Sequence, residues 1–347
     1  LCLGCMSYGD TSRGWHGDWV LDQDQSRPFI REAIEAGINF FDTANMYSMG
    51  ASEEVIGKLL PEFAHRDEIV VATKVFGRVS TLVREDASAA EKAEADRRET
   101  EARNISGLSR KHIMDSVEKS LERLQLDYID LYQVHGTDPL TPIEETVEAL
   151  DLLVRHNKVR YVGLCNMPAW LIMKALAYAR EKGLHRFESA QMYYSIAGRD
   201  LEREVVPLAK DQDLAILPWS PLAGGFLSGK FTRDSDGPND ARRTVFDFPP
   251  VDKEKGFDIV DVMREIADAK SVSVPQVALG WLVHQPHVTS VIVGASKVSQ
   301  LKDNLGAVDV EFSEDELARL NEVSALKAEY PGWMLERQQA DRLDQID

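Results

Sequence analysis

The chain has 347 residues, of which 44% are hydrophobic and 28% charged, a balance typical of a globular protein with a sizeable core rather than of a disordered chain. The length allows two domains of roughly 150 residues each or one large barrel. With 58 acidic and 40 basic residues, the formal charge is −18, which argues against nucleic acid or an anionic membrane surface as partner, since both attract basic protein faces. We therefore expect a soluble protein that acts on small molecules.

Cysteine content and apolar patterning bear on the cellular setting. Cys2, Cys5 and Cys165 are too few, and odd in number, for a disulfide framework, and this favours a reducing, cytoplasmic compartment. No apolar run approaches the roughly 20 residues that a membrane-spanning helix needs. Residue 1 is a leucine inside a predicted strand, so the sequence leaves open whether a targeting segment precedes it.

Short β-rich runs alternate with helical patterns along the whole chain. The predicted strands lie at residues 1–5, 38–42, 69–74, 128–135, 159–164, 188–191, 214–219 and 288–293. The clearest helical patterns lie at residues 27–36, 52–60, 109–124, 142–155 and 168–181. Gly37 stands where a helix C-terminus favours a left-handed residue, and Pro142 stands where the first turn of a helix tolerates proline.

This alternation predicts the fold class. Near-continuous apolar strands joined by helical crossovers indicate a buried parallel sheet, and eight such units within about 290 residues favour a closed (β/α)₈ barrel over an open doubly wound sheet. We therefore predict one barrel domain over residues 1–347, with an insertion at 77–107, a long loop at 222–256 after the seventh strand and a tail at 326–347. The Ala/Glu/Arg-rich run inside the insertion is either a solvated helix or part of a site or an interface.

Barrel enzymes build their active sites at the carboxyl ends of the strands. Successive predicted strands end here in polar or hydrogen-bonding side chains, namely Asp42, Lys74, His135, Asn166, Gln191, Trp219 with Ser220, and the segment 294–297. Any one of these is more often structural than catalytic. Their joint placement on consecutive strands predicts a site.

The chemistry of four residues narrows that prediction. Tyr47 follows Asp42 by a loop long enough to return a phenol over the barrel mouth. A phenol titrates near 10, so it donates a proton readily at neutral pH only where a cation stabilises its anion. Lys74 can supply that cation with Asp42 as its partner, and His135 can hydrogen-bond a substrate oxygen. The set is suited to carbonyl reduction and lacks the nucleophile of acyl transfer.

The motifs around these residues resemble the aldo-keto reductase family from residue 3 to about residue 324. The matching segments are 3–6 (LGCM), 37–44 (GINFFDTA) with Tyr47 and Glu53, 73–74 (TK), 127–135 (DYIDLYQVH), 142–146 (PIEET), 163–166 (GLCN), 220–222 (SPL) with Gly224 and Gly225, and 294–296 (GAS). The resemblance implies a catalytic tetrad of Asp42, Tyr47, Lys74 and His135.

The same resemblance implies a nicotinamide cofactor, usually NADPH, bound without a Rossmann fingerprint. Asn166 and Gln191 would bind its carboxamide, Trp219 would stack on its ring, and Gly4, Cys5 and Met6 would form the floor, with Asp42 nearby. Ser220, Pro221, Leu222, Gly224 and Lys230 would line the pyrophosphate, with Gly294, Ser296, Lys297, Gln300 and Asn304 around the adenosine phosphate. Many relatives place an arginine where Ser296 and Lys297 stand, so NADH is the alternative cofactor.

Other functions fit the sequence less well. The run 224–231 (GGFLSGKF) approaches a phosphate-binding loop but has Phe231 where that loop needs Ser or Thr. No His or Cys spacing indicates a metal site, and the Cys2/Cys5 pair lies on a predicted strand rather than at a helix start, where a redox pair lies. The alternative from another class is a nucleotide-sensing subunit that binds cofactor without turnover, as some family members do in membrane channels.

The substrate is less defined. Trp15 and Trp19 in the first loop and Trp170 after the Asn166 strand indicate an apolar or ring-bearing carbonyl compound, to be bound beside Tyr47 and His135. Alternatively, these aromatic side chains close the barrel top by packing. Trp333 in the tail either caps the pocket or docks elsewhere. No residue specifies the individual substrate, the physiological direction or the oligomeric state.

Overall fold

The computed structural model describes residues 1–13, 19–79, 88–101, 104–235, 237, 243 and 246–343. Its strands are β1 (Cys2–Gly4), β2 (Phe40–Asp42), β3 (Val70–Val75), β4 (Ile129–Val134), β5 (Val159–Cys165), β6 (Phe187–Tyr193), β7 (Ala215–Trp219) and β8 (Ile292–Val293). They form one parallel sheet in the order β7-β6-β5-β4-β3-β2-β1-β8. A parallel bridge between Ile216 and Val288 joins the two edges, so the sheet is a nearly closed barrel and the predicted fold class is confirmed.

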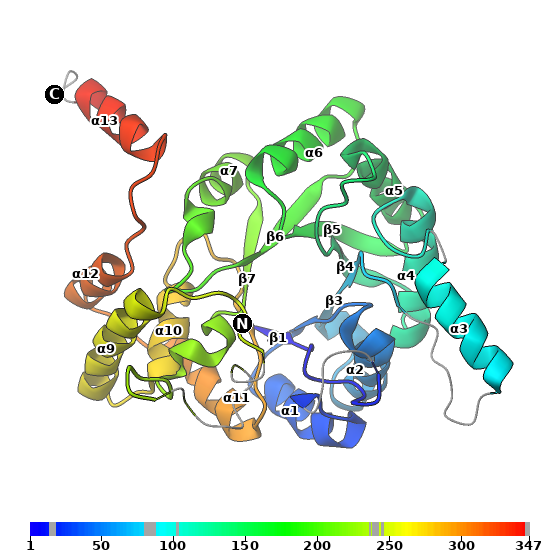
Figure 1. Cartoon of the computed structure of the whole chain (residues 1–347), viewed down its shortest axis with the longest axis horizontal. Helices are drawn as coiled ribbons and strands as arrows, with labels where there is room; N and C mark the ends of the chain where they lie inside the picture. The colour runs from blue at the N-terminus through cyan, green and yellow to red at the C-terminus, as the bar shows by residue number, and fades with distance from the viewer. Residues whose placement is uncertain are drawn as a thin grey trace.

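Helices cover the outside of this barrel. They are α1 (Gln23–Glu35), α2 (Ala51–Phe63), α4 (Arg110–Leu124), α5 (Ile143–Arg155), α6 (Ala169–Lys182), α7 (Val205–Gln212), α9 (Lys253–Lys270), α10 (Val274–Val283) and α11 (Val298–Leu305). From α1 they follow one another counterclockwise in Figure 1. Because βαβ crossovers are right-handed, this view looks onto the carboxyl ends of the strands.

Most predicted elements differ from the structure only at their ends. Gly37 has the left-handed φ of 87° expected after α1, and Ser109 caps α4 by accepting a hydrogen bond from the His112 amide. The eighth strand is much shorter than the predicted 288–293. There the chain pairs first with β7, through Val288, and then with β1, through Ile292 and Val293, because the barrel closes along this segment.

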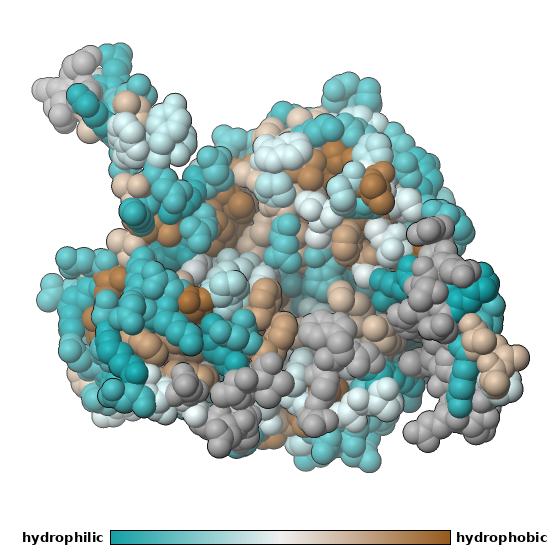
Figure 2. All heavy atoms as spheres, in the orientation of Figure 1, coloured by the Kyte–Doolittle hydropathy of each residue, from teal (hydrophilic) through white to brown (hydrophobic). Residues whose placement is uncertain are grey.

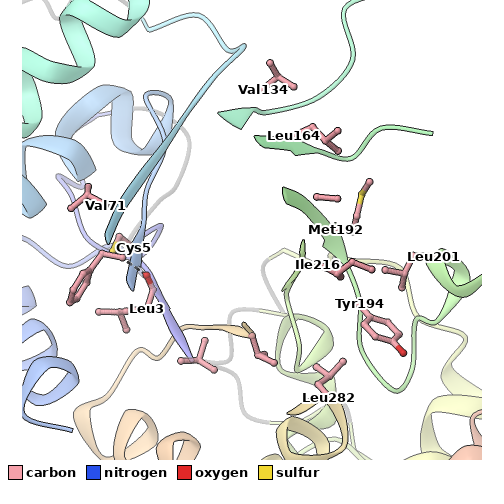
Figure 3. Close-up of a cluster of buried hydrophobic side chains, with 14 of the residues drawn as sticks. Leu3, Cys5, Val71, Val134, Leu164, Met192, Tyr194, Leu201, Ile216 and Leu282 are labelled. Carbon is pink, nitrogen blue, oxygen red and sulfur yellow. Dashed lines mark hydrogen bonds between the residues drawn. The ribbon is translucent and has the colours of Figure 1, made fainter. Parts of the chain in front are cut away.

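The strands divide the core into an outer and an inner part because successive side chains point to opposite faces of the sheet. Figure 3 shows part of the outer core, between sheet and helices, to which Leu3, Val71 and Ile216 contribute. The inner cluster is small and consists of Cys2, Ala72, Leu131, Leu217 and Ile292. On β2, β3 and β4 the inward positions at the carboxyl end are the polar residues Asp42, Lys74 and Gln133, so this part of the barrel interior differs from the apolar inner cluster.

Three elements lie outside the barrel repeat. α3 (Ala89–Glu101) occupies the predicted insertion and lies on the periphery of the molecule, with residues 89–94 exposed. The tail carries α12 (Glu314–Val323) and α13 (Gly332–Leu343), and α13 extends away from the barrel (Figure 1). No helix in the part of the chain that the structure describes is both long and apolar enough to cross a bilayer.

Candidate active site

A buried ion pair lies at the carboxyl end of the barrel interior. The Lys74 ammonium is fully buried and donates hydrogen bonds to Asp42 Oδ2 at 2.5 Å and to the Thr43 carbonyl at 2.8 Å. Its nitrogen lies 3.3 Å from the hydroxyl of Tyr47. Asp42 and Lys74 come from β2 and β3, which are neighbours in the sheet. Lys74 therefore joins the carboxylate to the phenol.

The Asp42 carboxylate is hydrogen-bonded on both of its oxygens. Oδ1 accepts from the Gln133 side-chain amide at 2.9 Å and from the Gln191 side-chain amide at 2.8 Å, while Oδ2 accepts from Lys74. Both glutamines are buried. A buried charge is tolerated where it is paired and its remaining lone pairs are satisfied. The sequence analysis missed Gln133, although its inward register beside Lys74 on β4 was a usable signal.

A tight turn returns Tyr47 over the barrel mouth. The 3₁₀ segment Tyr47–Gly50 follows β2, and the left-handed φ values of Ser48 and Met49, 46° and 50°, reverse the chain there. The Tyr47 ring lies with its centroid 4.8 Å from the Lys74 nitrogen. It meets the His135 ring edge-on, at 5.7 Å between centroids and 79° between planes. Four side chains from three strands and one loop thus converge.

Burial and the ammonium set the protonation states of these groups. Burial raises the pKa of Tyr47 above its ordinary 10, and Lys74 opposes that rise. The net shift of the Tyr47 pKa is upward because burial outweighs the ammonium, and the sequence does not show how completely the phenol is buried. Burial alone would lower the pKa of Lys74, but Asp42 and Tyr47 outweigh it and hold the pKa above its ordinary value. At neutral pH the phenol and the ammonium both carry their protons.

A second group of residues lies beside the ion pair and offers complementary hydrogen-bonding atoms. The Trp219 indole donates to Asn166 Oδ1 at 2.9 Å, so the Asn166 amide nitrogen is left to donate outward. The Gln191 amide nitrogen faces Asp42, so its Oε1 is left to accept. One outward donor and one outward acceptor match a primary carboxamide, which has one acceptor and one amino donor.

The segment after β7 forms a compact loop. Ser220 has a left-handed φ of 51°, and its hydroxyl accepts from the Gly224 amide at 2.9 Å. A side chain at Gly224 would lie 2.3 Å from the Phe248 carbonyl, so glycine is required there. Buried Arg243 fastens the loop by donating to the Ala223 and Pro249 carbonyls at 2.7 and 3.0 Å. Sequence reasoning missed Arg243, because no periodic pattern links it to the loop.

The model of the aldo/keto reductase family matches residues 1–325. The chain belongs to the aldo/keto reductase family.

Three relatives span nearly the whole of this aldo/keto reductase. The versiconal hemiacetal acetate reductase of Aspergillus parasiticus is 35% identical, over 96% of this chain and 95% of its own. A Schizosaccharomyces pombe protein named "Putative aryl-alcohol dehydrogenase" is 37% identical, over 93% and 91%. The norsolorinic acid reductase of Aspergillus flavus is 31% identical, over 95% and 79%. The family and these relatives make the chain an oxidoreductase of the carbonyl-reducing type.

The remaining residues predicted to hold the cofactor lie around the mouth of the aldo/keto reductase barrel. Figure 2 shows this face, and its surface is hollowed at the centre. Gly4 is in register with Asp42, and the buried Cys5 contributes its backbone amide, which donates to the Asp42 carbonyl at 2.8 Å. Met6, Pro221 and Leu222 are buried or half-buried, while Lys230 is exposed.

The predicted adenosine-phosphate residues gather after β8. Gln300 Oε1 accepts from the Ser296 amide at 3.2 Å and from its hydroxyl at 3.0 Å. Buried Asn304 donates to the Gly294 carbonyl at 3.4 Å. Exposed Lys297 immediately precedes α11. Ser296, Gln300 and Asn304 therefore shape the turn that presents Lys297 at the surface.

The predicted substrate residues are dispersed. Trp15 lies outside the described residues, and Trp19 is half-buried in the first loop. Trp170 is 68% exposed in the first turn of α6. Trp333 lies on α13, which extends away from the barrel, so the structure does not support a capping role for it. Phe248, which sequence analysis missed, stacks on Trp219 at 5.7 Å between ring centroids and 12° between planes.

The described residues contain no cluster of His, Cys, Asp and Glu side chains able to hold a metal ion. All three cysteines are free and buried. Burial raises the pKa of each thiol, Cys2, Cys5 and Cys165, so they stay protonated at neutral pH. Protonated thiols are neutral, so they add no charge beside the Asp42–Lys74 pair.

His135 leads to a prediction about stability and pH. Burial, together with the Lys74 charge, holds the pKa of His135 well below the ordinary 6.5. The unfolded chain therefore binds a proton at this residue below about pH 6.5 that the folded chain does not, and folding is weakened as the pH falls. The expected loss reaches about 1.4 kcal/mol per pH unit within this window.

Urea unfolding at pH 7.5 and 5.5 measures this effect. We expect His135→Gln to lose less free energy of unfolding than the unmodified chain between these two pH values. Exposed His156 provides the control, since His156→Gln should keep the full pH dependence. An equal loss in His135→Gln and the unmodified chain would contradict the prediction.

Proposed function

We propose that this protein is an NADPH-dependent reductase that converts an aldehyde or ketone to an alcohol, reversibly, with Tyr47 as the proton donor. The observation that carries the proposal is the Asp42–Lys74–Tyr47 chain, with the ammonium 2.5 Å from a carboxylate oxygen and 3.3 Å from the phenol oxygen. A buried cation beside a protonated phenol is the arrangement that general acid catalysis at a carbonyl oxygen requires.

Each residue of the tetrad has a defined task in this proposal. The bound nicotinamide supplies a hydride to the carbonyl carbon. Tyr47 donates its proton to the oxygen, and Lys74 stabilises the phenolate that results. Asp42 keeps Lys74 in place and compensates its charge. Neutral His135 orients the substrate carbonyl beside the phenol. In the reverse direction the Tyr47 phenolate takes the proton of the alcohol, and the hydride of the alcohol carbon would pass to the oxidised nicotinamide.

The chain's own donors and acceptors support a nicotinamide cofactor. The amide nitrogen of Asn166 and the remaining oxygen of Gln191 would fit the two ends of its carboxamide, and Trp219, whose indole binds Asn166, would offer a stacking surface. Gly4, Cys5 and Met6 would lie beneath the ring. The loop from Ser220 to Gly224, with Lys230, would hold the pyrophosphate.

The preference for NADPH over NADH rests on Lys297. Its ammonium would lie at the adenosine end, where a charge-assisted hydrogen bond to the 2′-phosphate would add affinity that NADH lacks. NADH remains the alternative cofactor, since a single lysine binds phosphate less specifically than an arginine fork does. The three free thiols support the cytoplasmic setting that we propose for this reaction.

We propose an aryl aldehyde or aryl ketone as the substrate class. Phe248 stacks on Trp219, and Tyr193 packs against the same residue with its ring 5.2 Å away, so aromatic side chains gather beside the proposed nicotinamide position. Flat apolar rings of this kind favour an aromatic ligand over a sugar. The name of the Schizosaccharomyces pombe relative, an aryl-alcohol dehydrogenase, points in the same direction.

Steady-state turnover tests the proposal. The purified chain is assayed with NADPH and with NADH against a panel of aryl aldehydes, aliphatic aldehydes and aldoses, and nucleotide oxidation is followed by absorbance. We expect repeated turnover, fastest with NADPH and an aryl aldehyde. The alternative is a nucleotide-sensing subunit without turnover, and it predicts at most one equivalent of oxidised cofactor per chain. That result would overturn the proposal that the protein is an enzyme.

A further inference from the structure

Gln133 is a fully buried polar residue inside the barrel that the proposed chemistry does not yet use. It lies on β4, in register with Lys74 on one side and with Gly163 on the other. Its side chain reaches past β5 to Gln191 on β6 and also contacts Asp42 on β2. Gln133 thus touches both the ionic centre and the candidate carboxamide site.

Gly163 provides the space for this reach. A side chain built at Gly163 would lie 3.1 Å from Cγ of Gln133 and 2.4 Å from the Ser189 hydroxyl. Because glycine occupies this inward position on β5, the Gln133 side chain crosses the strand without a clash. A larger residue at this position would press on Gln133 Cγ and disturb the hydrogen bond from Gln191 on β6 to Gln133 on β4.

The hydrogen bonds around Gln133 have one chemically consistent direction. A carboxylate only accepts, so the two amide nitrogens that contact Asp42 Oδ1 must be the donors. The carbonyl oxygen of Gln133 then accepts the second N–H of Gln191, at 3.2 Å. Both N–H groups of Gln191 are consumed, and its Oε1 has no hydrogen-bond partner within the described ranges.

We propose that Gln133 is a positioning residue that fixes the orientation of the Gln191 amide, so that Gln191 presents an acceptor, and never a donor, to the cofactor carboxamide. The inference rests on the proposed function for its cofactor. Asp42 binds one N–H of Gln191 and so selects which end of the amide faces inward, but a single hydrogen bond leaves the amide plane free to rotate. The second hydrogen bond, to Gln133, fixes that plane and with it the direction of Oε1.

The consequence is selectivity for the cofactor's amino group. A cofactor that carries an amide can donate to Gln191 Oε1, whereas one that carries an acetyl group in its place leaves that oxygen unpaired. An unmade neutral hydrogen bond lowers affinity by about three- to tenfold. Loss of Gln133 leaves the Gln191 amide held by Asp42 alone, so its plane can rotate away from the cofactor amide and the difference between the two cofactors should shrink.

Cofactor titrations followed by tryptophan fluorescence test this. The Kd values of NADP⁺ and of its 3-acetylpyridine analogue are measured for the unmodified chain, for Gln133→Met and for Gln133→Glu. We expect the unmodified chain to prefer NADP⁺ about three- to tenfold, as a net neutral hydrogen bond gives. Gln133→Met, which keeps the shape and loses the amide, should lose most of that preference.

Gln133→Glu adds a readout that a merely structural role would not move. Beside Asp42 the introduced carboxyl takes up a proton more readily than an exposed one, because two adjacent carboxylates repel. Once protonated, it donates to Asp42 and accepts from Gln191, as the native amide does. The preference for NADP⁺ should therefore return in Gln133→Glu as the pH is lowered, and it should stay absent in Gln133→Met.

A matched control is Gln276→Met. Gln276 also makes structural hydrogen bonds, to Ser273 and Asp303, but it lies on α10 outside the barrel interior. Its loss should lower the melting temperature and leave the cofactor ratio unchanged. If Gln133→Met keeps the native ratio, the role of Gln133 is refuted while the proposed function stands. If the unmodified chain binds neither nucleotide, both proposals are overturned.

Discussion

Tyr47→Phe is expected to lower kcat for carbonyl reduction by a factor of about 10²–10⁴, the usual contribution of a positioned general acid. The phenol oxygen is the only atom removed, and it lies 3.3 Å from the Lys74 nitrogen in the unmodified chain. The Phe ring keeps its place over the ammonium and beside His135, so packing changes little. The loss should therefore appear in kcat, with the Kd for NADPH unchanged.

Two further measurements separate proton donation from damage to the fold. Melting of Tyr47→Phe should follow that of the unmodified chain, and single-turnover assays should show that the slow step is the chemical one. Tyr178→Phe is the matched control, because this phenol donates to Glu148 between the outer helices α5 and α6 and has no role in the proposed site. A Tyr47→Phe enzyme within tenfold of native kcat would remove Tyr47 as the proton donor.

Lys74→Met is expected to lose both activity and stability. Removing one member of a buried pair leaves an uncompensated charge on Asp42, at a cost of about 3–5 kcal/mol in the free energy of unfolding. The phenolate that Tyr47 would become also loses its cation, so turnover should fall at least as far as in Tyr47→Phe. Urea unfolding and steady-state kinetics measure the two effects separately.

A double variant tests the charge argument. In Asp42→Asn/Lys74→Met the charge is gone, and the asparagine oxygen can still accept from Gln133 and Gln191. We expect this double variant to be more stable than Lys74→Met alone, while remaining inactive. If it were instead less stable by the sum of the two single losses, then lost packing rather than unpaired charge would explain the effect.

The barrel was predictable from sequence because its strands are apolar and its helices amphipathic, and these hydrophobic patterns can be read from one sequence. The predicted eighth strand is the exception. The run 288–293 reads as one strand, yet Val288 pairs with β7 while Ile292 and Val293 pair with β1. Hydrophobic period shows that a residue is buried in a sheet, but it does not show which neighbour the residue pairs with.

The candidate site was predictable only in part. Asp42 and Lys74 stood at strand ends, where polar residues are conspicuous, and the structure pairs them. Gln133 lies inside an apolar strand, two residues before His135, and Arg243 lies in a loop with no periodic pattern. Neither residue could therefore be recognised from the sequence as part of the site. The upward pKa shift of Tyr47 was missed for a different reason, since it depends on burial by segments distant in sequence.

The seam between β1 and β8 has a consequence for how the chain acquires its function. Leu3 pairs with Val293, so the barrel closes only when the first strand of the chain pairs with the last. Contacts between such distant segments form late in folding, because loop-closure entropy must be overcome first. A growing chain on the ribosome therefore lacks the finished mouth until almost all of it has been made. Any small molecule that binds across both strands favours the closed ring by mass action, so occupancy and folding stability are thermodynamically linked.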